Sequence, residues 1–222
     1  MWHDALLVAG KDLRIELRSR VATNQIAPFA LLVLVLFAFA LDNDRGVLTA
    51  AAGGLYWVAI LFSALLAVQR SAAIESADGA RDQLRLSGLD PAGIFLGKAA
   101  AVAAQLIALE VLLAAGIVIL YNATIEGVVL VVLTNVFATA GLAAAGTLYG
   151  SLAAGLKVRE TLLPLLLLPV AAPLLLGATE AWQAALGGHP GDGTEWLKLL
   201  GVFAVVYLTF GVLAFGSLLE ES

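Results

Sequence analysis

Six long apolar runs constrain this chain more than any other feature of its sequence. A helix that crosses the roughly 30 Å hydrocarbon core of a bilayer needs about 20 predominantly apolar residues. Such runs occupy residues 24–41, 50–69, 93–121, 128–153, 161–179 and 196–219. Only 13% of the residues are charged, whereas a soluble domain carries about a quarter. We therefore predict an all-α membrane protein, with six transmembrane helices in one domain over residues 1–222.

The distribution of Lys and Arg predicts how these helices are oriented. Cytoplasmic loops of membrane proteins accumulate basic residues, and ten of the twelve in this chain fall on one side of six alternating spans. These ten are Lys11, Arg14, Arg18, Arg20, Arg70, Arg81, Arg85, Lys98, Lys157 and Arg159. Only Arg45 and Lys198 fall on the other side. The pattern places both termini, residues 75–91 and residues 155–160 in the cytoplasm.

Residues 1–20 predict an amphipathic helix that lies in the membrane interface before the first span. Its apolar residues recur at spacings of three and four, namely Trp2, Leu6, Ala9, Leu13 and Leu17. Its basic residues cluster away from that stripe, as in helices that lie on a membrane surface. A cleaved signal peptide is the rival interpretation, because Ala38-Phe39-Ala40 follows an apolar run. The long charged segment before that run disfavours it.

A segment of unusual charge density, residues 75–91, separates the second and third spans. It reads ESADGARDQLRLSGLDP. Asp78 and Asp82 come early and Arg81 and Arg85 late, which suits the dipole of a short interfacial helix. Gly88 and Pro91 then mark the end of that helix. The segment is either a binding site for a partner protein or a solvated connector.

Motifs for catalysis or cofactor binding are absent from the sequence. The nearest match to an ATP-binding P-loop is Gly93–Lys98, but its first glycine is one position late and Ala99 replaces the required hydroxyl residue. The two histidines, His3 and His189, stand far apart, and there is no cysteine, so no zinc motif can form. We predict no catalytic residue, no metal, no cofactor bound by this chain alone, and no nucleic-acid partner.

Polar residues within the spans are candidates for function. Glu110 is the single acid deep inside a span, and carboxyl groups are costly to bury in lipid. It acts either in transport or as a hydrogen-bonded structural group whose partner would be Asn135 or Thr139 on the fourth span. Gly146 and Gly150 on that span have the small-x-x-x-small spacing typical of closely packed helices. The fifth span carries three prolines, which bend helices.

Three stretches together resemble one known family. They are WVAILFSALLAVQR (57–70), DGARDQL (78–84) and residues 155–181. Their order and spacing resemble the CcmB family, the heme exporter protein B permeases of the cytochrome c maturation ABC transporter. The resemblance implies a six-helix permease of the ABC-2 exporter type in the bacterial inner membrane. It also implies a second copy of the chain, a CcmA-like ATPase that holds ATP and Mg²⁺, CcmC-like and CcmD-like membrane partners, and haem as a possible cargo.

The resemblance also implies which residues receive the motion of the ATPase. The coupling segment would consist of Glu75, Asp78, Gly79, Arg81, Asp82, Gln83, Leu84 and Arg85. Lys157 and Arg159 lie in the second cytoplasmic loop. The chain departs from the family pattern at Gln69, where Glu is usual, and Glu110 is not part of the motif. Two alternatives stay open, namely an ABC-2 permease for a lipid, glycan or drug, and a secondary carrier that works without ATP.

Overall fold

The computed structural model describes residues 1–41, 44–76, 87–154, 159–187 and 189–221, and this part of the chain contains helices and no strand. The elements are α1 (Trp2–Ser19), the π-helix η1 (Ala22–Ile26), α2 (Ala27–Ala40), α3 (Arg45–Ser76), α5 (Pro91–Leu120), α6 (Val128–Ala154), α7 (Arg159–Leu186), the 3-10 helix η2 (Pro190–Gly193) and α8 (Thr194–Glu221). The all-α fold class predicted from the sequence is confirmed.

Within the described part of the chain, five helices are long and apolar enough to cross a membrane, namely α3, α5, α6, α7 and α8. The 14 residues of α2 are too few for a span. Together with α1, however, α2 forms a pair bent by 54° that raises the number of candidate spans to six. The sequence therefore encodes a multi-pass membrane protein.

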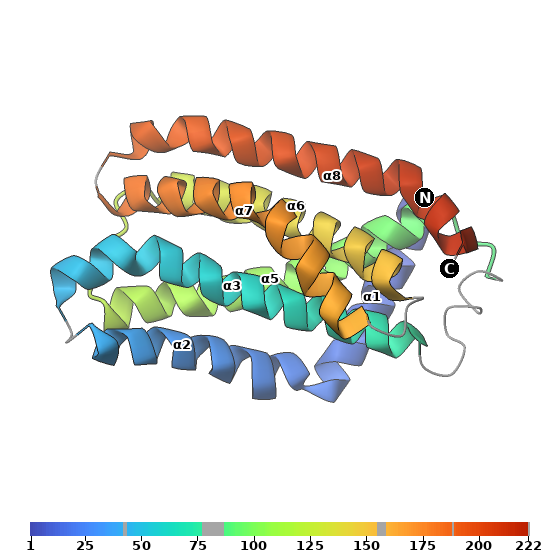
Figure 1. Cartoon of the computed structure of the whole chain (residues 1–222), viewed down its shortest axis with the longest axis horizontal. Coiled ribbons are helices and arrows are strands. Elements are labelled where there is room, and N and C mark those ends of the chain that lie inside the picture. The colour runs from blue at the N-terminus through green and yellow to red at the C-terminus, as the bar shows by residue number, and fades with distance from the viewer. Residues whose placement is uncertain (42–43, 77–86, 155–158, 188, 222) are drawn as a thin grey trace.

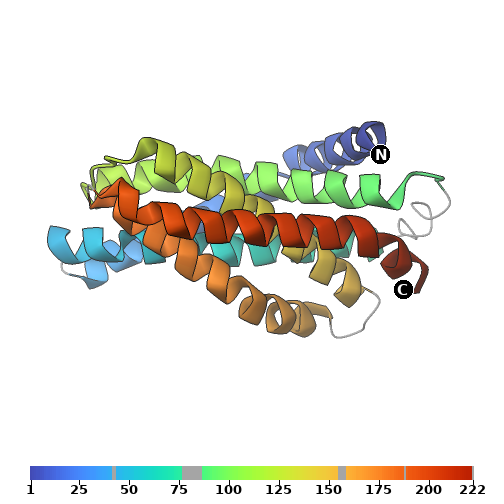
Figure 2. The same ribbon diagram turned by 90° about the horizontal axis from the view of Figure 1, so that it is seen from above.

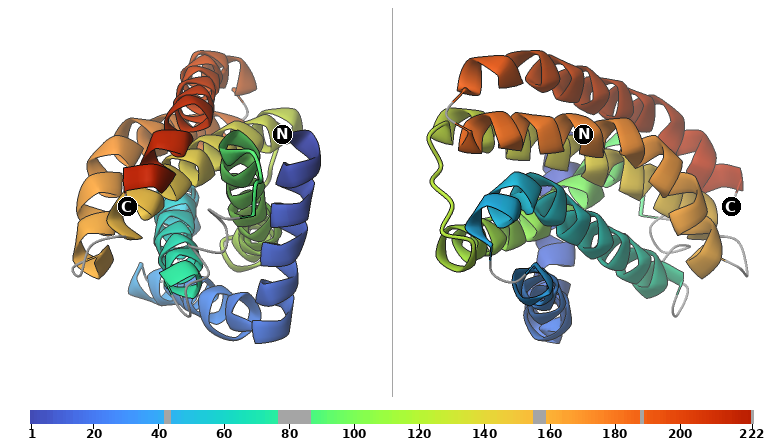
Figure 3. Two further views of the ribbon diagram at one scale, coloured as in Figure 1. Left: turned by 90° about the vertical axis from the view of Figure 1, so that its right-hand side faces the viewer. Right: turned by 60° about the vertical axis from the view of Figure 1, so that its left-hand side comes forward.

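The long helices run side by side, and both chain termini lie at the same end of the bundle (Figure 1). The last turns of α3 and α6 and the first turns of α5 and α7 lie at this end too. We call it the basal end and the opposite one the distal end. In contrast to the long helices, α1 lies across the basal end on the outside of α5 (Figures 2 and 3).

Helix α6 is the centre of the bundle, where it contacts α3, α5, α7 and α8. Its buried residues are mostly small, which lets neighbouring backbones approach closely. Gly146 and Gly150 flank Val68 of α3, since a Cβ atom added at either glycine would lie 2.8 or 2.7 Å from a Val68 methyl carbon. The predicted packing face therefore contacts a helix of the same chain.

Helix α8 is held against α5 by a second close approach at the basal end. Phe95 is fully buried in a small cluster with Val8, Leu148 and Phe215. A Cβ atom added at Gly211 would overlap the Phe95 ring. Only glycine allows the α8 backbone to lie on this ring, so this position fixes the distance between the two helices.

Helix α7 differs from its predicted extent. It contains Pro164, Pro169 and Pro173 and bends along its length (Figure 1). We expected this span to end at residue 179 because polar residues follow, but the helix continues to Leu186. The extension is stabilised because Ala178, Ala181, Trp182 and Ala185 form a fully buried stripe against the core. Gln183 also donates a hydrogen bond to the Ala50 carbonyl oxygen of α3, while Glu180 is exposed.

Candidate functional site

The basal end begins with a close contact between α1 and the first turns of α5. Asp90 caps α5 by accepting a hydrogen bond from the Ala92 backbone N–H at 3.0 Å, and Pro91 occupies the first helical position. A Cβ atom at Gly93 would lie 2.7 Å from the Met1 carbonyl oxygen, and one at Gly97 would lie 2.6 Å from the Ala5 carbonyl oxygen. The two glycines that resemble part of a P-loop therefore form the surface on which α1 packs.

Two ion pairs tie α1 to the long helices. The Glu16 carboxylate of α1 accepts a hydrogen bond from Arg70 Nε of α3 at 3.1 Å. The Lys98 ammonium of α5 lies 3.8 Å from Asp12 Oδ2, and its side chain is only 4% exposed. A buried charge is costly unless it is paired, so these acids compensate the two cations that α3 and α5 carry at the basal end.

The start of α1 makes a third polar contact. The Asp4 carboxylate accepts hydrogen bonds from the Met1 α-amino group at 3.1 Å and from the Asp90 backbone N–H at 3.3 Å. These two donors lower the pKa of Asp4 below its usual value, with the α-amino group contributing most. The Asp4 side chain therefore joins α1 to the residue that caps α5.

A cavity of about 450 Å³ lies at the basal end beside these contacts. Its walls come from the end of η1, from α3, from α6 and from the start of α7. Gln25, Gln69 and Arg70 supply its polar groups, and Leu66 and Leu163 are among its apolar residues. The family motif around Gln69 and Arg70 therefore faces a space between helices as well as the α1 ion pair.

A second polar cluster lies inside the bundle and brings together the predicted intramembrane residues. Thr139 of α6 donates a hydrogen bond to Oε1 of Glu110 on α5, and Glu110 is 1% exposed. Among the described residues, its other carboxyl oxygen has no hydrogen-bond partner. Asn135 lies one turn before Thr139 on the same helix and belongs to the same cluster through Tyr56. The alternative in which Glu110 pairs with Thr139 is thus realised in the structure.

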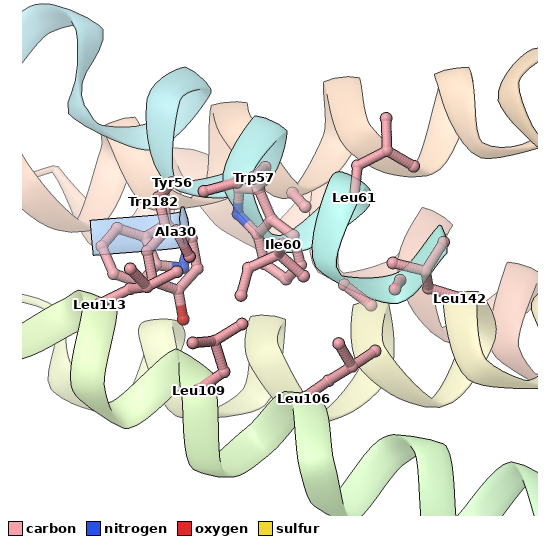
Figure 4. Packing of buried hydrophobic residues seen from close by; sticks show 14 of the residues in the cluster. Ala30, Tyr56, Trp57, Ile60, Leu61, Leu106, Leu109, Leu113, Leu142 and Trp182 are labelled. Atoms are coloured by element: carbon pink, nitrogen blue, oxygen red, sulfur yellow. The ribbon is translucent and has the colours of Figure 1, made fainter. Parts of the chain in front are cut away.

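Two aromatic residues complete this cluster, and sequence analysis did not assign either of them to it. Tyr56 of α3 accepts a hydrogen bond from Asn135 Nδ2 at 2.8 Å and donates one to the Glu110 carbonyl oxygen at 3.3 Å. Trp182 of α7 donates to Asn135 Oδ1 at 2.8 Å and stacks on Tyr56, with ring centroids 4.0 Å apart (Figure 4). The cluster therefore links α3, α5, α6 and α7.

The signal for Tyr56 and Trp182 was present in the sequence but ambiguous. Aromatic residues with a polar tip need a hydrogen-bond partner when they are buried, and Asn135 is a bifunctional partner within a span. Trp182, however, fell outside the predicted fifth span, in what we expected to be a connection. Because the predicted span ended at residue 179, the contact between Trp182 and Asn135 was not expected.

Most of the predicted coupling segment lies outside the described residues. This applies to Asp78, Gly79, Arg81, Asp82, Gln83, Leu84 and Arg85, and also to Lys157. The backbone of Glu75 belongs to the last turn of α3, and Arg159 is the first residue of α7. Both helix ends lie at the basal end, so the two predicted cytoplasmic loops begin or finish on the same side of the bundle (Figure 1).

Comparison with known proteins places the whole chain in one family. A family model described as CcmB protein matches residues 3–222. The chain is 31% identical to heme exporter protein B of Escherichia coli K12, with 95% of each protein covered. It is 29% identical to heme exporter protein B of Haemophilus influenzae, covering 98% of this chain and 97% of the relative. With this coverage, the chain belongs to the CcmB family.

Proposed function

We propose that this chain is the membrane permease subunit of a haem exporter that serves the maturation of c-type cytochromes. The observation that supports this most is the match over nearly the full length of both proteins, since similar coverage extends to heme exporter protein B of Paracoccus denitrificans, at 27% identity. The family consists of transporter subunits rather than enzymes, and a multi-pass helical bundle suits that role.

The energy for transport would come from a separate ATPase. The sequence has no P-loop, and the glycines nearest to one are occupied by the packing of α1. We infer that a CcmA-like subunit with ATP and Mg²⁺ binds at the basal end, through residues 75–85 and the loop with Lys157 and Arg159. The described ends of α3, α5, α6 and α7 support this, because they surround one face beside both termini.

The basal end would then face the cytoplasm, and the chain would lie in the bacterial inner membrane. Described basic residues support this orientation, since Lys11, Arg70 and Lys98 form ion pairs at the basal end and Lys198 follows η2 near the other end. Loops rich in Lys and Arg stay in the cytoplasm. The assembled transporter would contain a second copy of the chain together with CcmC-like and CcmD-like membrane subunits.

The cargo would be haem or a haem-loaded chaperone. In the first case, ATP hydrolysis drives haem across the membrane. In the second, hydrolysis releases the chaperone from the haem-handling subunit. Both assign the same task to this chain, which is to convert the motion of the ATPase into a change at the distal end.

Affinity purification in mild detergent tests this function directly. We expect the tagged chain to copurify with a P-loop ATPase and with haem-handling membrane subunits, and its deletion to abolish haem-stained c-type cytochromes. An ABC-2 permease for a lipid, glycan or drug would copurify with an ATPase but leave the cytochromes normal. A secondary carrier would keep its activity as the isolated chain in vesicles, with no ATPase bound.

A further inference from the structure

The charged residues of α1 are sorted between its two sides. All three of its acids face the bundle, because the side chains of Asp4, Asp12 and Glu16 are only 20%, 16% and 9% exposed. Lys11, Arg14 and Arg18, in contrast, are exposed on the outer side. Glu16 pairs with Arg70 of α3, Asp4 pairs with the Met1 α-amino group, and Asp12 lies between Lys98 of α5 and Lys11 of α1 itself. The outer face carries no acid of α1, so Arg14, Arg18 and the exposed Lys11 give it a net positive charge.

The outer face of α1 also carries apolar side chains that no described residue covers. Trp2, Leu6 and Leu17 are 71%, 75% and 76% exposed. They are the residues of the stripe predicted to lie in the membrane interface, whereas the bundle is contacted by the small and acidic side of the helix. A shallow groove on this face is lined by Leu6, Leu7, Gly10, Lys11, Arg14, Ile15 and Arg18.

α1 lies beside the basal ends of α3 and α5. It packs on Gly93 and Gly97, within the first two turns of α5, and contacts Arg70 near the end of α3. It lies across the bundle rather than along it, at the periphery (Figure 3). α1 turns by 54° from α2, which runs along the bundle (Figure 1), so it inclines away from the direction of the long helices and its outer face points away from their basal ends.

We propose that the outer face of α1 binds anionic phospholipid headgroups, with Lys11, Arg14 and Arg18 contacting phosphate groups and Trp2, Leu6 and Leu17 entering the acyl boundary. An acidic protein surface would complement the same cations. The three apolar side chains, each more than 70% exposed, favour a membrane, since they require an apolar environment beside the charges. This proposal is independent of the cargo and of the ATPase.

The test measures lipid preference of the full chain in phosphatidylcholine vesicles by electron paramagnetic resonance of spin-labelled lipids. We expect labelled phosphatidylglycerol to associate several-fold more strongly than labelled phosphatidylcholine. Neutralising a basic residue at the membrane surface changes binding by up to about fivefold. The variant Lys11→Gln/Arg14→Gln/Arg18→Gln should therefore bring the ratio of association constants close to one. Lys198→Gln, which removes an exposed charge near the distal end, should leave the ratio unchanged.

Salt provides a second measurement on the unaltered chain. Surface charges are screened as the Debye length falls to a few ångströms near 1 M salt, so the preference for phosphatidylglycerol should disappear there. Equal association constants for both lipids in the unaltered chain would overturn the proposal. So would a triple variant that keeps the lipid ratio, and if that variant also lost a copurifying protein, the face would bind an acidic protein instead.

Discussion

The Arg70 guanidinium of α3 lies 3.1 Å from the Glu16 carboxylate of α1. The two residues are far apart in the sequence, and the Glu16 side chain is almost buried. This contact, with the Asp12–Lys98 pair, determines where the first helix lies relative to the spans. Its removal is therefore the most direct test of the basal architecture.

The variant Glu16→Ala should lower the stability of the protein by about 1 to 3 kcal/mol, because it leaves a partly buried guanidinium without its acceptor. The measurement is the thermal unfolding midpoint in detergent. Glu16→Gln keeps an acceptor oxygen and should lose less. In a double-mutant cycle, the effects of Glu16→Ala and Arg70→Ala should not be additive; additive effects would mean that the pair contributes nothing.

Substitution of Gly211 tests the close approach of α8 to α5. Gly211→Ala places a methyl group on the Phe95 ring and should cost about 1 to 3 kcal/mol through overpacking. Gly201 lies in the same helix with nothing within 4 Å of an added Cβ atom. Gly201→Ala should therefore be neutral or slightly stabilising. Phe95→Leu in the Gly211→Ala background should recover part of the loss, and if it does not, the overlap is not the cause.

Removing a hydrogen bond from the intramembrane cluster should lower the stability of the protein by a modest amount. Hydrogen bonds between transmembrane helices contribute about 0.6 kcal/mol on average and at most about 1.7. Tyr56→Phe removes a hydroxyl that serves both Asn135 and the Glu110 carbonyl group, so we expect a loss in this range. Tyr149→Phe removes a hydroxyl that bonds to Tyr207 outside this cluster and is the comparison variant. A larger loss for the comparison variant would contradict the importance of the cluster.

Glu110→Gln separates the two interpretations of Glu110. Glutamine keeps the size and the acceptor for Thr139 but removes the titratable group. If Glu110 acts only through this hydrogen bond, the thermal unfolding midpoint should be unchanged. The yield of mature cytochrome c should then stay within twofold of that of the unaltered chain. Loss of maturation with unchanged thermal stability would instead assign Glu110 to transport.

Reversing the charges of Asp82 and Arg85 tests the proposed ATPase contact. Asp82→Lys/Arg85→Glu should weaken copurification of the ATPase, or uncouple ATP hydrolysis from cytochrome c maturation. The reason is that each reversed side chain would face a charge of its own sign on the ATPase. Glu195 and Lys198 form an exposed acid–base pair with the same spacing, 2.6 Å apart near the other end. Their reversal should change neither readout. Normal assembly and maturation in the first variant would exclude the segment as a coupling site.

The membrane architecture could be predicted because it depends on length and polarity alone. A run of about 20 apolar residues allows little else, and Glu110 in such a run must find a polar partner. Thr139 was one of two candidates on the fourth span, and the structure selects it. The end of α7 could not be predicted, since Glu180 and Gln183 suggested a loop. Only the packing of Trp182 against Tyr56 shows why the helix continues.

The face on which α1 packs could not be predicted either. Its apolar stripe was expected in the membrane interface, and Trp2, Leu6 and Leu17 do point away from the bundle, but nothing in the sequence indicated which helix the opposite face would contact. The choice depends on a surface elsewhere in the chain, because Gly93 and Gly97 admit only a helix with small residues on the approaching side. The sequence of α1 alone does not contain that information.

The packing of α1 on Gly93 and Gly97 also determines when α1 can reach its final position during synthesis of the chain. Residues of α1 leave the ribosome long before Gly93, Gly97 and Lys98, the residues of α5 that they contact. At about 5 to 20 residues per second, Gly93 follows Glu16 after roughly 4 to 15 s. During that interval the surface of α5 on which α1 packs, with Gly93, Gly97 and Lys98, has not yet been synthesised. The first helix can therefore take its final place only after the helix that begins at Pro91 has been inserted.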